Sequence, residues 1–224
     1  MSKKILLYLG IVLLIFMIHS CTSNPEKTLL DRYFHAMDFN DSNTLSTIAI
    51  EPADFEFDSW GIVNVTEEYT ETFELPELDK KGKELKKKLD DHTVETLNVR
   101  DEVDAAKFEM ERRRTRANIN KFDEAEEKYN KLYEENKELR KEYNEVRDAA
   151  DREEETALFS LGGDFSQVRQ FEGDVHKKEV EVKVQRNGEE ANYKIYMRRY
   201  ELKDPTTNIT HSGRWIILRF EKMA

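Results

Sequence analysis

Cys21 is the residue whose position most clearly marks a chemistry, because it is the one cysteine in a chain of 224 residues. A thiol can be acylated, can ligate a metal or can act as a nucleophile. A single cysteine supports neither a disulfide scaffold nor a multi-cysteine metal site. Of the five histidines, His19 precedes Cys21 in the segment expected to be removed, and none of the other four stands at metal-ligand spacing from a cysteine or from a second histidine. We therefore expect no metal site and no cofactor.

The sequence also lacks the motifs of common catalytic sites. It contains no Gly-x-Ser-x-Gly turn and no Gly-x-x-x-x-Gly-Lys phosphate loop. Its 47 Asp and Glu residues are too many for one pair to be selected as a general acid and base. No catalytic residue can be named on these grounds, and we expect a protein that is not an enzyme.

The segment before Cys21 has the organisation of a secretion signal. Lys3 and Lys4 precede an apolar run from Ile5 to Ile18. As a helix, a run of this length would span about 21 Å, which is less than the roughly 30 Å of a bilayer core. A positive start followed by a short apolar run is typical of a signal peptide. Residues 1–20 are therefore expected to be removed.

The residues Ile18-His19-Ser20-Cys21 resemble the lipobox of bacterial lipoproteins, although His19 stands where that family prefers a small or β-branched residue. The resemblance implies cleavage before Cys21 and acylation of this cysteine, which would tether the protein to a membrane. Thr22 follows, and by analogy with enteric lipoproteins this permits sorting to the outer membrane. The expected location is the cell envelope, lipid-anchored, with the outer membrane favoured over the inner. The alternative is an incidental cysteine in an uncleaved anchor.

Charge excludes further classes of protein. The chain has 36 Lys and Arg against 47 Asp and Glu, a net charge of −11. Nucleic-acid binders need clustered positive charge over a whole domain, so no nucleic-acid partner is expected. A polytopic membrane protein needs several apolar runs of about 20 residues, which this chain does not contain.

Composition divides the remainder into three parts. No Gly or Pro occurs between Lys83 and Leu161, a stretch rich in Glu, Lys, Arg, Leu and Ala, as in long helices and coiled coils. The flanking segments hold both Trp residues and most turn signals. We predict an α+β domain in two halves, residues 21–76 and 162–224, interrupted by a helical insertion over residues 77–161.

The second half of the insertion carries a heptad seam. Apolar or small side chains recur at alternating steps of three and four, with Asn136 and Glu153 in the gaps. The seam positions are Phe122, Ala125, Tyr129, Leu132, Leu139, Tyr143, Val146, Ala150 and Ala157. A weaker seam precedes it, and the phase breaks between Glu111 and Lys121. A turn there predicts two helices of about 38 residues paired antiparallel, whereas a continuous helix would carry its far end some 120 Å away. Asn136 is expected to set the register of the pair, and the alternative is a partly exposed amide without that role.

The flanking halves predict a helix packed on a curved antiparallel sheet. Residues 25–37 have an amphipathic helical pattern, and residues 60–74 and 179–197 alternate as strands, with a two-residue turn at Asn187-Gly188. A polar loop is expected before the last strand, residues 214–220.

The helix Leu29-Leu30-Asp31-Arg32-Tyr33-Phe34-His35-Ala36-Met37 and the segment Gly213-Arg214-Trp215 resemble the first helix and the last strand of the nuclear-transport-factor-2-like superfamily. The resemblance implies a cone-shaped domain. Some members are isomerases or hydrolases with a pocket inside the cone, which Asp31, Tyr33, His35 and Trp60 could line.

Positive charge gathers at the expected turn of the hairpin, in Arg112, Arg113, Arg114 and Arg116. Such a patch in an acidic protein indicates an anionic partner: lipid head groups, a cell-wall polymer or an acidic envelope protein. A solvated turn is the alternative.

The favoured function is a membrane-anchored binding or scaffolding lipoprotein whose arm contacts a partner. A small-molecule-binding or isomerase-like cone is the second hypothesis. A periplasmic adaptor of an export system is the third, although the flanks of the insertion lack lipoyl-like half-motifs.

Overall fold

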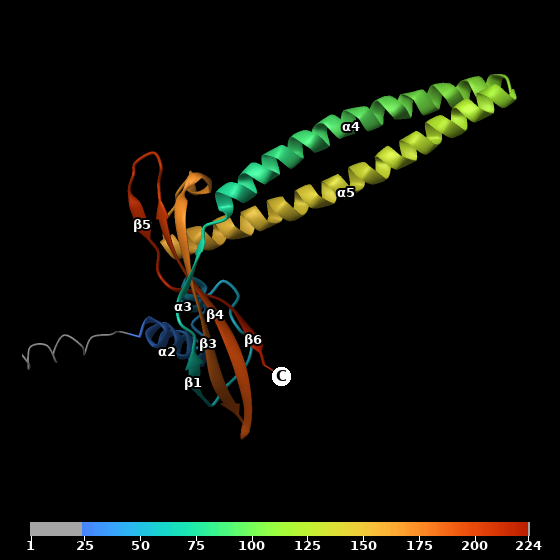
Figure 1. Cartoon of the computed structure of the whole chain (residues 1–224). Helices are drawn as coiled ribbons and strands as arrows, with labels where there is room; N and C mark the ends of the chain where they lie inside the picture. Colours follow the sequence, from blue (N-terminus) through green and yellow to red (C-terminus); the bar gives the residue numbers. More distant parts are fainter. Residues whose placement is uncertain (1–23, 224) are drawn as a thin grey trace, which may run out of the picture. The chain divides into compact units, whose positions relative to one another are not determined.

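The computed structural model describes residues 24–223, and these residues form an α+β structure with a strongly curled antiparallel sheet (Figure 1). This confirms the predicted fold class. The signal segment and Cys21 lie outside the described residues. The elements in chain order are α2 (Pro25–Asp38), α3 (Ser42–Ile48), β1 (Ser59–Val65), β2 (Tyr69–Thr72), α4 (Leu75–Arg112), α5 (Arg116–Leu161), the 3-10 helix η1 (Val168–Gln170), β3 (Glu172–Arg186), β4 (Glu189–Lys203), β5 (Thr210–Ser212) and β6 (Ile216–Lys222).

The chain divides into two compact units. Among the described residues, unit 1 comprises 24–70, 176–199 and 214–223, and unit 2 comprises 71–175 and 200–213. Strands β3 and β4 each contribute residues to both units. Each unit has its own buried cluster of apolar side chains.

Unit 1 packs helix α2 against the sheet. Pro25 occupies the first turn of α2, where its missing N–H costs nothing. Asp41 caps α3 by accepting a hydrogen bond from the N–H of Thr44 at 3.1 Å. The hydrogen bond from the Thr44 hydroxyl, and then the one from its N–H, lower the pKa of the Asp41 carboxyl. The apolar face of α2, the end of α3 and the inward-facing strand residues form one core: Leu30, Tyr33, Phe34, Ile48, Ala49, Val180, Val182, Val184, Ile195, Met197 and Ile217.

The strands of the sheet follow a simple order. Strands β1 and β2 pair with β3, and β5 and β6 pair with β4. The Asn187-Gly188 turn between β3 and β4 has positive φ angles at both residues, 52° and 82°, as a two-residue hairpin requires. The final strand buries both Ile216 and Ile217, as expected for a segment that is apolar on both faces.

The single strand expected over residues 60–74 is wrong in one respect, because the segment forms two strands, β1 and β2. The interruption begins at Thr66. Its N–H donates to the carbonyl of Glu179 at 3.0 Å, and its hydroxyl oxygen accepts from the N–H of Glu179 at 2.9 Å. A side chain thus takes over one of the ladder bonds at the end of β1.

Unit 2 contains the predicted antiparallel hairpin, formed by α4 and α5 (Figure 1). The continuous-helix alternative is not adopted. Every predicted seam position of α5 is partly or fully buried. In α4 the weaker seam is also covered, with Leu85, Val99 and Ala106 at most 4% exposed. Gly162 ends α5 in the left-handed conformation, φ 69°, that commonly terminates helices.

Strand β5 was not expected, because residues 204–213 were predicted to be a polar loop. Leu202 pairs with His211 and Lys203 pairs with Thr210, which extends the antiparallel ladder of β4. Backbone pairing of a polar segment leaves no hydrophobic alternation in the sequence, which explains the difference. The core of unit 2 comprises Phe73, Leu75, Ala150, Ala157, Val168, Phe171, Val175, Tyr200 and Leu202.

Candidate functional site

The turn between α4 and α5 is held by a single asparagine. The Asn118 side-chain amide donates to the carbonyl of Glu109 at 3.1 Å and to that of Arg113 at 2.6 Å. Thr115 caps α5 by accepting the N–H of Asn118 at 3.3 Å. Both carbonyls also accept a backbone N–H, from Arg113 and Thr115 respectively, so the Asn118 amide adds a second donor to each. The Thr115 cap pairs an N–H that the start of α5 would otherwise leave without a partner. The turn is therefore a defined structure that presents its side chains from fixed positions.

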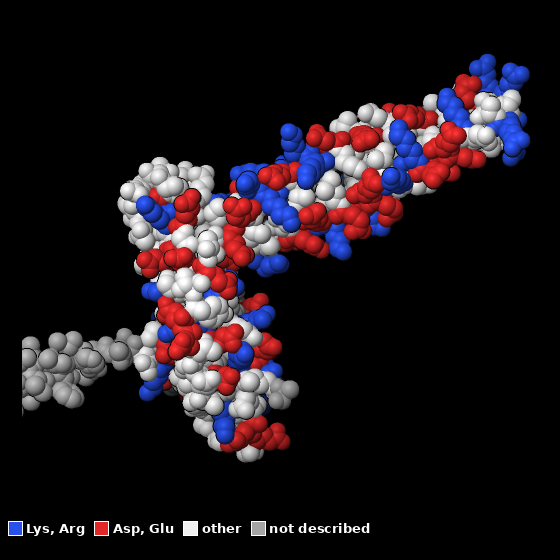
Figure 2. Space-filling model, viewed as in Figure 1, with Lys and Arg blue, Asp and Glu red and all other residues white. Residues whose placement is uncertain are grey.

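The arginines predicted to bind a partner stand around this turn. Arg112, Arg113, Arg114 and Arg116 are all exposed, and none of them forms an ion pair with another residue between 24 and 223. Figure 2 shows Lys and Arg side chains gathered at the far end of the hairpin. Residues 107–121 hold six basic side chains against two acidic ones, whereas in the rest of the chain acidic residues outnumber basic ones by 45 to 30. The structure thus brings these four residues into one cationic surface, which we call the tip.

The shaft between the tip and the base is a two-helix coiled coil with polar contacts between its helices. The Asn136 side-chain amide donates to the Thr93 hydroxyl at 3.0 Å across the seam. On the outside, Lys128 pairs with Glu102 at 3.3 Å between the helices. A half-buried amide that bonds to a partner across the seam penalises shifted alignments, because a slip leaves both groups without that bond. The expected role of Asn136 in register is consistent with this contact.

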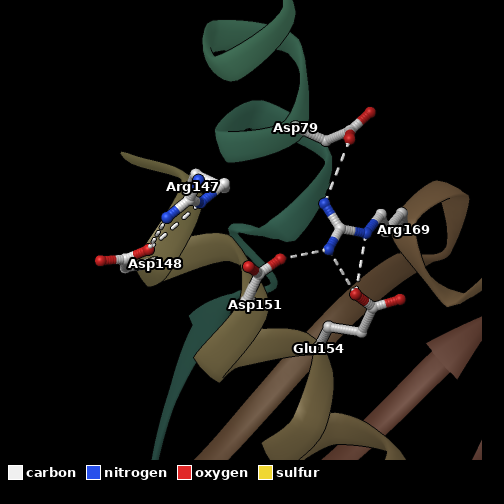
Figure 3. A network of polar contacts seen from close by, with 6 residues as sticks. All are labelled: Asp79, Arg147, Asp148, Asp151, Glu154 and Arg169. Atoms are coloured by element: carbon white, nitrogen blue, oxygen red, sulfur yellow. Dashed lines mark hydrogen bonds and ion pairs between the residues drawn. The ribbon is translucent and has the colours of Figure 1, made fainter. Parts of the chain in front are cut away.

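The base of the hairpin is clamped by an arginine that the sequence did not single out. Arg169 in η1 contacts three carboxylates from both helices (Figure 3). Its guanidinium donates to Glu154 at 2.5 and 2.8 Å, to Asp151 at 2.6 Å and, in α4, to Asp79 at 3.5 Å. Hydrogen bonding to Glu154 and then Asp151 raises the pKa of the Arg169 guanidinium above its ordinary value. Arg169 therefore joins α4, α5 and the segment that follows them.

A second set of contacts anchors the end of α5 to β4 within unit 2. The Tyr200 hydroxyl donates to the Glu153 carboxylate at 2.9 Å, and the Tyr200 N–H donates to the Ser160 hydroxyl at 3.3 Å. Gly213 lies against the same serine, since a Cβ on this glycine would stand 2.4 Å from the Ser160 hydroxyl oxygen. These contacts explain why a carboxylate occupies the seam gap at Glu153.

In unit 1 the core face of the sheet ends in a cluster of charged side chains around Glu68. Its carboxylate accepts from His176 at 2.8 Å and lies 3.6 Å from both Lys178 and Arg199. These residues come from the β1–β2 connection, β3 and β4. One carboxylate thus faces three potentially cationic groups.

Trp215 and Glu26 complete this charged cluster. Lys178 and Arg199 both lie over the Trp215 ring, at 5.3 and 5.6 Å from its centre. Lys178 also pairs with the buried Glu26 of α2 at 3.4 Å. The Nε of Arg199 is buried without a hydrogen-bond partner among the described residues. Stacking on the indole offsets part of the cost of holding two cations close together.

The four residues expected to line a cone pocket do not converge. Tyr33 is fully buried in the core, and Trp60 stacks on Phe34 with ring centres 4.3 Å apart. Asp31 and His35 are exposed. A hollow of about 410 Å³ lies elsewhere in unit 1, and its lining includes Met37, Leu45, Asp54, Phe55 and Phe57. Asp31, Tyr33, His35 and Trp60 therefore do not form a site.

Cys21 lies outside the described residues, so its predicted acylation stays a prediction. Across residues 24–223 there is no group of three or more His, Cys, Asp or Glu side chains placed to hold a metal ion. Among the described helices, none has the length and apolar character needed to cross a bilayer. No protein-family model matches the chain, and neither do curated proteins or solved structures.

Proposed function

We propose that this protein is a membrane-anchored extracytoplasmic lipoprotein that acts as a binding or scaffolding module, with the hairpin as the arm that contacts its partner. The observation that carries the proposal is the tip: four exposed arginines without ion-pair partners in the described chain, on a turn held by Asn118. Unpaired cationic groups on a fixed framework attract an anionic surface without first breaking internal ion pairs.

The lipobox resemblance at Cys21 supplies the anchor in this proposal. Acylation at the start of the mature chain would hold the protein at the envelope, with the outer membrane favoured over the inner. The hairpin would extend the reach of the anchored protein, since a helix of 38 residues such as α4 is about 57 Å long. The expected partner of the tip is an envelope component with an anionic surface.

Crosslinking from the tip in living cells tests this proposal. A photo-crosslinking amino acid in place of the exposed Ala117 should capture a partner, whereas the same group in place of the exposed Val94 on the shaft should not. Changing Arg112, Arg113, Arg114 and Arg116 to Glu should abolish the adduct and leave thermal unfolding unchanged, because these side chains make no internal ion pairs. An undiminished adduct in the charge-reversed variant would show that the arginines do not bind the partner and that the tip is a solvated turn.

A second candidate function, binding or conversion of a small molecule by unit 1, is favoured by one observation. The cluster of Glu68, His176, Lys178 and Arg199 gathers charged groups at the end of an apolar core, and the buried Nε of Arg199 has no hydrogen-bond partner in the described chain. A helix on a curled sheet also suits the nuclear-transport-factor-2-like resemblance. Ligand-dependent stabilisation that is lost on Arg199→Met would support this function, and a screen without any stabilising ligand would count against it.

A further inference from the structure

The tip carries an exposed aromatic side chain beside its arginines. Phe108 is 63% exposed and precedes Arg112 by four residues on α4, so the two side chains lie on the same face of the helix. The seam of α4 runs through Val99, Ala106 and Met110 and does not include Phe108. Phe108 therefore lies outside the seam of the coiled coil and adds a mostly exposed apolar group beside the arginines.

The size of the tip limits the kind of partner it can hold. Each helix is about 10 to 12 Å across with its side chains, so the end of a two-helix hairpin offers roughly 200 to 250 Å². A stable protein partner typically covers about 800 Å² on each side. A charged lipid surface needs no such area, because each basic residue near it contributes independently to binding. Head groups meet the arginines, and the acyl boundary accepts an aromatic ring, which a hydrated cell-wall polymer does not.

We propose that the tip docks on an anionic lipid bilayer, with the four arginines against head-group phosphates and Phe108 inserted at the acyl boundary. This inference rests on the proposed function and names the partner of the arm. Each arginine near an anionic surface is worth about fivefold in partitioning, so the four together give several hundredfold. Burying the Phe108 ring adds about tenfold. Fixing the turn through Asn118 keeps the five side chains together before binding, which lowers the ordering cost.

The test reads the depth of the tip in a membrane. Phe108→Trp is introduced into the full chain, which is reconstituted into phosphatidylcholine vesicles. In the first arm, separate vesicles of phosphatidylglycerol with brominated acyl chains are then added. In the second arm, the brominated phosphatidylglycerol is instead mixed into the phosphatidylcholine vesicles that hold the protein. Bromine quenches only an indole that reaches the acyl region. The parent chain, with Trp60 and Trp215 alone, supplies the background. We expect quenching in at least one arm with phosphatidylglycerol and none with brominated phosphatidylcholine.

Matched variants separate the tip from general charge. In the Phe108→Trp chain, changing Arg112, Arg113, Arg114 and Arg116 to Gln should lower partitioning several hundredfold. Changing the exposed Lys86, Lys87 and Lys88 of the shaft to Gln should alter it less than about twofold, since they lie more than two turns of α4 from the tip. In the chain without the tryptophan probe, vesicle flotation should show about a tenfold loss for Phe108→Ala and no loss for Leu97→Ala, which is 52% exposed on the same helix.

Four outcomes would overturn the inference: no quenching in either arm, equal quenching with the neutral lipid, an intact response in the arginine variant, or an equal loss in the lysine variant. Soluble polyphosphate that protects the arginines from chemical modification, without any quenching by vesicles, would assign the tip to a free phosphate polymer. Capture of an envelope protein from Ala117 without lipid quenching would remove this inference but leave the proposed function in place. If neither crosslinking from Ala117 nor lipid quenching gives a signal, both the proposed function and this inference are wrong.

Discussion

Tyr33 shows how one side chain in unit 1 combines packing with hydrogen bonding. It is fully buried, and its ring stacks on Phe220 with centres 4.9 Å apart. Its hydroxyl oxygen accepts the N–H of Ala53 at 2.7 Å, which ties the segment before β1 to helix α2. Burial raises the pKa of the Tyr33 hydroxyl to about 12, and the hydrogen bond from Ala53 offsets a smaller part of that rise.

This raised pKa predicts a loss of stability in alkali. The folded state holds the Tyr33 proton more tightly than the unfolded state. The contribution of this proton to the free energy of unfolding is therefore complete below the ordinary tyrosine pKa of about 10. It should disappear as the pH rises through about 12, lowering the free energy of unfolding by roughly 3 kcal/mol. Urea unfolding at a series of alkaline pH values measures it.

Tyr33→Phe is the control for this pH dependence. The variant should lose the Tyr33 part of the alkaline step, and at neutral pH it should be less stable by about 1 kcal/mol because the N–H of Ala53 loses its acceptor. An alkaline slope equal to that of the wild type would show that Tyr33 does not titrate as described.

At the level of elements, the hairpin and η1 are joined by Arg169. Its four hydrogen bonds to Asp79, Asp151 and Glu154 link η1 to both helices of the hairpin (Figure 3). The nearby Arg147 makes a different kind of contact, since it is exposed and its ion pair is with its chain neighbour Asp148. The two arginines therefore form a natural comparison.

We expect Arg169→Met to lower the stability of unit 2. Charge-assisted hydrogen bonds are stronger than neutral ones, but the Arg169 side chain is 34% exposed and solvent screens it, so the loss should be about 1 kcal/mol. Arg147→Met should leave unfolding unchanged, because its pair lies on the surface of one helix. Denaturant unfolding followed by the helix signal measures both variants. Equal effects of the two substitutions would contradict the claim that Arg169 stabilises unit 2 by joining α4, α5 and η1.

At the level of the whole molecule, the charges are distributed unevenly. The chain as a whole carries −11, whereas residues 107–121 are strongly basic. An anionic membrane would repel the negative charge of the rest of the protein, whereas it would attract the cationic end of the arm. An anchor at Cys21 and a cationic tip would give the protein two distinct points of attachment.

Acylation of Cys21 is the prediction that belongs to this scale. Radiolabelled palmitate should enter the wild-type chain and fail to enter Cys21→Ser, because the chain offers no second thiol. Wild-type protein should also stay with the membrane fraction after a high-salt wash, since acyl chains hold by burial in lipid and not by charge. Equal labelling of the two proteins would end the lipoprotein proposal.

The features that the sequence alone determined are those encoded over short distances. The seam of the hairpin follows from a repeat of three and four residues, and the turn follows from the loss of that phase after Glu111. The Asn187-Gly188 turn and the alternation around Val180, Val182 and Val184 are equally local. The four arginines of the tip are near neighbours in the chain, so they had to gather wherever the turn placed them.

Only the tertiary structure decided which distant groups meet. Arg169 finds Asp79 across 90 residues, and Glu68 finds His176 across 108. A chain with 47 carboxylates gives no local signal for the few that have such partners, because partnership depends on strand register and on how each loop closes. For the same reason β5 and the break between β1 and β2 were missed: both arise from hydrogen bonds to a neighbouring strand, which leave no period in the sequence.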